Sequence, residues 1–133
     1  MNDNINKVYH IFFDKESNIV VMDWDGYATS EQFREGTETM LKILIENKAR
    51  RVLADAKDMT IIGSDDQKWM ETDFLPRAIQ FGIKACAIVR PVSYFNKIAV
   101  ESVSYKVDKE KLLINFFDTA IEAREWLQKL PYN

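Results

Sequence analysis

The sequence has few of the residues that build disulfides, metal centres and phosphate-binding loops. Its 133 residues include one cysteine, one histidine, four glycines and three prolines. Cys86, as the only cysteine, cannot form an internal disulfide, and His10, as the only histidine, cannot build a zinc site alone. No glycine-rich phosphate loop or dinucleotide-binding fingerprint is present. These absences argue against a disulfide-stabilised scaffold, a histidine-based zinc protein and the common nucleotide-binding folds.

An excess of positive charge and long hydrophobic runs are also missing. Eighteen Lys and Arg residues face 21 Asp and Glu residues, which gives a formal net charge of -3. Nucleic-acid binders need clustered Lys and Arg to displace phosphate counterions, and a membrane span needs roughly 18 apolar residues in a row. The first seven residues lack the basic start and apolar stretch of a secretory signal. We therefore expect no nucleic-acid partner, no membrane span and a cytoplasmic location.

The composition that remains is that of a globular domain. Apolar residues make up 47% of the chain and charged residues 29%, enough to fill one core and cover its surface. Domains typically contain about 100 to 150 residues. The sequence therefore predicts a single domain over residues 1–133.

Apolar runs rich in β-branched and aromatic residues predict the strands. The runs at 8–13 and 19–24 flank a polar turn, so the chain is expected to open with a β-hairpin. The run at 85–89 is apolar at every position, as expected for a central parallel strand covered on both faces. Further strands are expected at 52–54 and 112–117.

Capping signals predict where the helices begin. Thr29 and Gln32 have the spacing of a capping box, and Ser64 and Gln67 repeat it before a second helix. Pro76 must kink or split that second helix, because it lacks a backbone N–H. The other two helices are expected to be capped by Ser93 and Asp118.

The order of these elements predicts the fold class. Strands that alternate with helices indicate parallel crossover units, so we expect an α/β fold with a five-stranded mixed sheet. It starts with the β-hairpin and continues through βαβα units. Because crossovers are right-handed, the four helices should lie mainly on one face of the sheet. The other face would stay partly open for a partner.

Two motifs, together with this element order, resemble the STAS-like family of small bacterial proteins. The motifs are Trp24-x-Gly26-x-x-Thr29-x-x-x-Phe33 and Phe116-Phe117-Asp118-x-x-x-x-Ala123-x-x-Trp126-Leu127. The resemblance spans nearly the whole chain and implies a non-enzymatic interaction module without a cofactor. The best-understood such modules are antagonists of anti-sigma factors, and related CRAL-TRIO-like lipid-transfer domains suggest an apolar ligand.

Ser64 lies where the resemblance implies a phosphorylatable residue, at the start of the helix after the third strand. Antagonists usually carry Asp-Ser-Ser-Gly there, whereas this chain has Gly63-Ser64-Asp65-Asp66. A phosphate would gain from the helix N-terminus but would be repelled by the two carboxylates. Ser64 is thus the regulatory candidate, and our preferred interpretation is that it serves only as an N-cap.

An apolar strand that ends in Asp23-Trp24-Asp25-Gly26 supports a different function. Haloacid-dehalogenase-type phosphotransferases present their nucleophile in this way, with Asp23 attacking phosphorus, Asp25 acting as acid and base, and Mg²⁺ offsetting the charge. We keep this as the alternative. A central parallel position of the 19–24 strand with converging acidic side chains would favour the enzyme, whereas an antiparallel edge partner would favour the STAS-like fold.

The loop before Ser64 is unusually apolar for a solvated connection. Together with aromatic residues of the second and third helices it predicts a cleft that accepts an apolar small molecule or a partner's side chain. We therefore predict a non-enzymatic binding or regulatory module that acts through a protein partner, a homodimer contact or an apolar ligand. The cleft candidates are Met59, Ile61, Ile62, Trp69, Tyr94 and Phe95.

Overall fold

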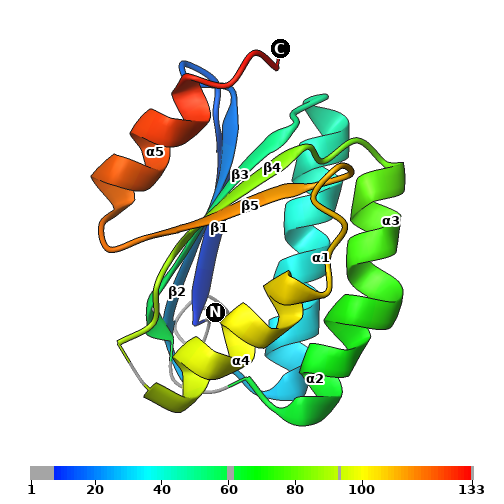
Figure 1. Ribbon diagram of the computed structural model, residues 1–133, viewed down its shortest axis with the longest axis vertical. Coiled ribbons are helices and arrows are strands. Elements are labelled where there is room, and N and C mark those ends of the chain that lie inside the picture. Colours follow the sequence, from blue (N-terminus) through cyan, green and yellow to red (C-terminus); the bar gives the residue numbers. More distant parts are fainter. Residues whose placement is uncertain (1–7, 60–61, 93, 133) are drawn as a thin grey trace, which may run out of the picture.

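The protein is an α/β domain with one five-stranded sheet (Figure 1). The computed structural model describes residues 8–59, 62–92 and 94–132. No helix in these ranges is long and apolar enough to cross a membrane. The strands are β1 (Tyr9–Asp14), β2 (Ile19–Gly26), β3 (Arg51–Met59), β4 (Ala85–Val89) and β5 (Leu113–Phe117). The helices are α1 (Ser30–Glu46), α2 (Ser64–Trp69), η2 (Met70–Phe74), α3 (Leu75–Gln80), α4 (Tyr94–Tyr105) and α5 (Ala120–Gln128).

The strands lie in sequence order across the sheet. The edge strand β1 pairs antiparallel with β2, and every other neighbouring pair is parallel. This confirms the predicted mixed sheet and its opening hairpin. It also places β2 between the antiparallel edge strand β1 and the parallel neighbour β3.

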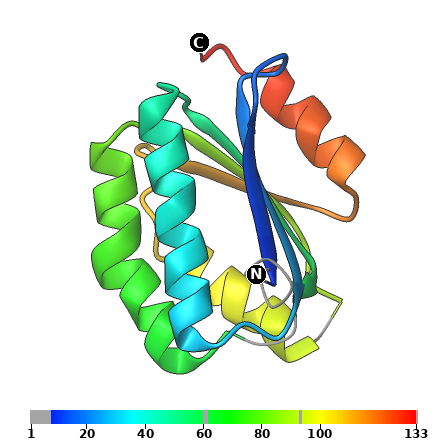
Figure 2. The ribbon, with the colours of Figure 1, turned by 180° about the vertical axis from the view of Figure 1, so that it is seen from behind.

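Helices cover both faces of the sheet, but unequally. The three crossovers place α1, the α2–η2–α3 rod and α4 on one face, whereas α5 packs on the other (Figures 1 and 2). Ala123 and Leu127 of α5 are fully buried against Leu53, Ala85 and Ala87. The handedness rule constrains a helix between two parallel strands. Because α5 follows the last strand, the rule leaves its face undetermined, and the prediction that the helices lie mainly on one face is confirmed with α5 as the exception.

Two predicted caps are displaced by one residue. Gly63, and not Ser64, has the extended N-cap backbone of α2, and as a glycine it has no side chain to cap this end. Ser64 is the first helical residue, so our N-cap interpretation of it was wrong. At α5 the cap is Thr119, whose hydroxyl accepts the Glu122 N–H at 3.2 Å. Asp118 instead accepts an ion-paired hydrogen bond from Arg90 at 3.1 Å.

The first helix begins as its sequence predicts. Thr29 Oγ1 accepts the Gln32 N–H at 3.1 Å, and Gln32 Oε1 accepts the Thr29 N–H at 3.0 Å. This reciprocal pair is the capping box of α1. The predicted cap of the third helix, Ser93, lies outside the described residues, and α4 is described from Tyr94.

Pro76 divides the second helix, as predicted, through a π-helical segment. The Leu75 N–H bonds the Met70 carbonyl, five residues earlier, and η2 separates α2 from α3. Proline has no N–H to continue the regular pattern, and a π-helical turn accommodates that break without ending the rod. The rod therefore stays continuous beside α1 (Figure 1).

Candidate ligand cavity

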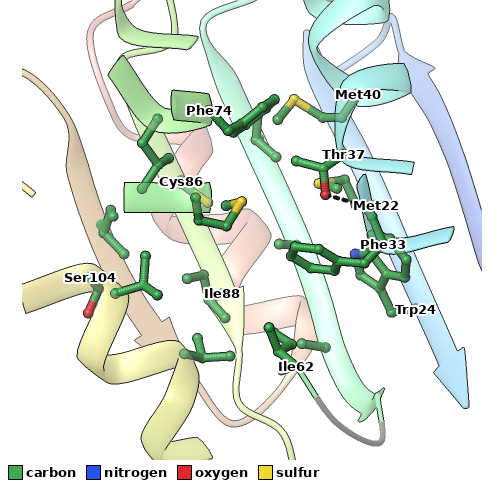
Figure 3. A pocket seen from close by; sticks show the side chains of 18 of the residues that line it. Met22, Trp24, Phe33, Thr37, Met40, Ile62, Phe74, Cys86, Ile88 and Ser104 are labelled. Carbon is green, nitrogen blue, oxygen red and sulfur yellow. Dashed lines mark hydrogen bonds between the residues drawn. The ribbon is translucent and has the colours of Figure 1, made fainter. Parts of the chain in front are cut away.

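A cavity of about 130 Å³ lies between the sheet and the helices of its more covered face (Figure 3). Strands β2, β3 and β4 supply its floor through Met22, Ala54 and Cys86. Helix α1 and the η2 segment close one side with Phe33 and Phe74. Helix α4 borders the other side with Val100, Val103 and Ser104.

The cavity is deep at one end and open at the other. Met22, Phe33 and Phe74 are at most 6% exposed, so the end beneath α1 and η2 is sealed from solvent. Val100 and Val103 of α4 are only partly buried. The opening therefore lies on the α4 side.

The burial pattern of β4 shows the gap in the helix layer most directly. Ala85, Ala87 and Val89 face α5 and are at most 1% exposed, whereas Cys86 and Ile88 face the cavity and are only partly buried. A central strand covered on both faces should be buried at every position. The 85–89 segment is central as predicted, but the helices leave part of its cavity-facing side uncovered.

Small side chains on neighbouring strands produce this space. Ala54 lies beside Ile88 in the β3–β4 register, and Cys86 lies beside Val52. Larger residues at 54 and 86 would extend into the cavity from its floor. Because adjacency of strands is a tertiary property, our sequence reasoning sought the cleft among helices and a loop and missed the sheet residues of the floor.

The walls of the cavity are uncharged. Of the described residues that line it, none is Asp, Glu, Lys, Arg or His. The two lining hydroxyls already donate to helical carbonyls: Thr37 Oγ1 to Phe33 O at 2.7 Å, and Ser104 Oγ to Glu101 O at 2.8 Å. Burial raises the pKa of the Cys86 thiol to about 12, so the thiol is neutral near pH 7. Such a surface favours an apolar occupant.

The predicted cleft residues fall in three groups. Met59 and Ile62 line the cavity. Trp69 stands behind its wall, with its ring 5.4 Å from Phe74 and the Arg34 guanidinium 5.1 Å from its centroid. Ile61 and the side chains of Tyr94 and Phe95 lie outside what the structure describes. The regulatory candidate Ser64 is exposed at the start of α2.

The carboxylates of the alternative enzyme hypothesis lie on the opposite face of the sheet. Met22 and Trp24 line the cavity, so Asp23 and Asp25, which alternate with them, point away from it. Asp55 and Asp58 of β3 lie opposite Asp23 and Asp25 in the strand register.

Acidic side chains do converge at this place. Desolvation raises the pKa of Asp23, and the charges of Asp55 and Asp25 raise it further. Among the described residues, however, no group of three or more His, Cys, Asp or Glu side chains is placed to hold a metal ion. Asp55 also accepts the Lys57 N–H at 3.2 Å, as a loop-capping carboxylate does. The acidic side chains are therefore close together, but the described residues provide no metal-binding group among them.

No protein-family model matches the chain, and no curated protein matches it significantly.

Proposed function

We propose that this protein is a non-catalytic, STAS-like binding module that holds a small apolar group in the cavity between the sheet and α1, η2 and α4. The observation that carries the proposal is the partial exposure of Cys86 and Ile88 on the helix-covered side of the central strand β4. Those side chains border an uncharged space that opens to solvent. An apolar occupant would complete the layer that the helices leave incomplete.

The size of the cavity limits the occupant. An engineered apolar cavity of about 150 Å³ in another protein stays dry and binds benzene or xenon. A cavity of about 130 Å³ should therefore accept a group of about six carbon atoms. At roughly 0.8 kcal/mol per buried methylene, six carbons contribute at most about 5 kcal/mol, so the dissociation constant should be no lower than roughly 0.3 mM, and the cost of association raises it further.

Toluene is a suitable probe for this proposal. In a titration followed by ¹H–¹⁵N NMR, we expect saturable shifts at residues 52–56, 86–88 and 100–104. Ala54→Leu should fill the floor and weaken binding at least tenfold, and Cys86→Leu should do the same from β4. Ala120→Leu is the matched control, because Ala120 is exposed on α5 across the sheet.

Two results would overturn the proposal. One is the absence of saturable toluene binding to the wild-type protein. The other is unchanged toluene affinity in both filled variants while their melting temperatures show that they are folded.

A magnesium-dependent phosphotransferase that uses Asp23 and Asp25 is the second candidate, favoured by the convergence of Asp55 and Asp58 on these carboxylates. The proposed binding function predicts no hydrolysis of p-nitrophenyl phosphate above the buffer rate in the presence of Mg²⁺. Turnover that is lost in Asp23→Asn would establish the enzyme instead.

A further inference from the structure

A second hollow lies beside the open end of the cavity. Its volume is about 230 Å³, and Ser104, Leu112 and Ile114 line both spaces. Ile114 and Phe116 alternate along β5 and so share the cavity side of the sheet. The hollow therefore continues the cavity from the floor of β3 and β4 toward the edge strand β5.

The hollow differs from the cavity in being charged. Its lining includes Arg90, Lys109 and Glu101, in addition to apolar side chains. The two cations exceed the single anion by one positive charge. An apolar space that adjoins a charged one fits a molecule with an apolar part and a charged end.

Arg90 is held in place but keeps hydrogen-bonding capacity. Its guanidinium lies 5.7 Å from the Phe116 ring centroid, and its Nη1 atom bonds Asp118 at 3.1 Å. The Asp118 side chain is 83% exposed, and such surface ion pairs contribute little. A guanidinium has five N–H donors and suits two-point binding of a carboxylate. Arg90 can therefore bind an anion without breaking a strong existing contact.

Lys109 provides the second positive charge. Its side chain is exposed, and within the described residues it forms no ion pair. Its neighbour Lys106, in contrast, already pairs with Glu71 at 2.9 Å. Lys109 is thus the cation of the hollow that needs to give up no partner on binding an anion.

We propose that the ligand is an amphiphile whose apolar part, a chain or ring of about six carbon atoms, fills the cavity while a carboxylate end lies in the hollow beside Arg90 and Lys109. This inference rests on the proposed binding function and adds the chemical class of the ligand. Glu101 opposes the carboxylate and so reduces the preference for it.

The test compares three molecules of equal chain length: heptanoate, heptan-1-ol and heptylamine. Each has an alkyl chain for the cavity and differs in the charge of its end group. NMR titrations at pH 7 and constant salt should show heptanoate binding about three- to tenfold more tightly than heptan-1-ol, with heptylamine weakest. Lys109→Ala should remove the advantage of heptanoate and leave heptan-1-ol unchanged.

Two further variants sharpen the test. Glu101→Gln should strengthen heptanoate binding about two- to threefold by removing the opposing charge. Lys129→Ala is the matched control, because Lys129 is an exposed lysine at the end of α5 on the other face of the sheet. It should change no affinity.

The possible failures are distinguishable. If none of the three molecules binds, the proposed function fails and this inference with it. If heptan-1-ol or heptylamine binds as tightly as heptanoate, the apolar site stands and the carboxylate is wrong. A preference for heptanoate that survives Lys109→Ala, heptanoate affinity that Glu101→Gln leaves unchanged, or a Lys109→Ala loss that is equal for heptan-1-ol would also overturn the inference.

Discussion

At the scale of single residues, the pKa of Cys86 reflects the apolar surroundings of the cavity. The residue is only partly buried where it lines the cavity, yet desolvation of its thiol raises the pKa to about 12. The thiolate is the reactive form of cysteine, and an unperturbed thiol has a pKa of about 8.5. We therefore expect the Cys86 thiol to react slowly, although the residue is only partly buried.

This combination predicts slow alkylation of the folded protein. At pH 8, iodoacetamide should modify native Cys86 about a thousandfold more slowly than the urea-unfolded chain, because so little thiolate is present. The native rate should rise about tenfold for each pH unit up to pH 10. Mass spectrometry of a time course measures both rates. A native rate at pH 8 close to that of the unfolded chain would show that the thiol is not in an apolar surrounding.

At the scale of elements, Gly36 decides how closely α1 approaches the hairpin. A Cβ atom at this position would lie 2.6 Å from a ring carbon of Trp24 and 3.0 Å from Tyr9. Replacing glycine by alanine in a helix normally stabilises it by about 1 kcal/mol. At position 36, overpacking against the buried Trp24 ring should make the same substitution destabilising.

We therefore expect Gly36→Ala to lower the free energy of unfolding by about 1 to 3 kcal/mol in urea denaturation. Gly63→Ala is the comparison, because within the described part of the chain no atom beyond its two neighbours lies within 4 Å of its added Cβ. Its effect should stay at or below the loss of about 1 kcal/mol expected at an N-cap. A stabilised Gly36→Ala variant would mean that α1 and the hairpin are less closely packed than described.

The helices and strands also show which features of the structure could be predicted from the sequence. The hairpin, the α1 capping box and the break at Pro76 depend on neighbouring residues, and local patterns identified them. The cap positions predicted at Ser64 and Asp118 are each wrong by one residue, and Asp118 instead pairs with Arg90. The apolar run at 85–89 was predicted as a strand, but the place of Cys86 in the cavity floor depends on strand neighbours far away in sequence.

At the scale of the whole molecule, α5 is tied back to the opening hairpin. Arg124 Nη1 bonds Asp14 at 2.7 Å and Ser17 Oγ at 3.0 Å. The Ser17 hydrogen bond and the Arg124 contacts lower the pKa of Asp14, outweighing the opposite effect of desolvation. The carboxylate contributes stability that is present above its unfolded pKa of about 3.9 and lost as the pH falls through the folded value.

Asp14→Asn should therefore destabilise the protein by up to about 1 kcal/mol at pH 7, because the ion pair is partly exposed. The difference from wild type should shrink progressively as the pH falls below 4. Urea denaturation at pH 7 and at pH 3 measures both values. An undiminished difference at pH 3 would show that the effect comes from packing and not from charge.

The proposed function requires that the space between the sheet and α4 can hold an apolar occupant. Diffraction from a crystal pressurised with xenon tests this directly, because xenon enters apolar cavities without needing a polar contact. We predict a xenon peak in contact with Cys86 and Ile88, and its loss in Ala54→Leu. A well-ordered crystal with no peak at that position would contradict the central claim.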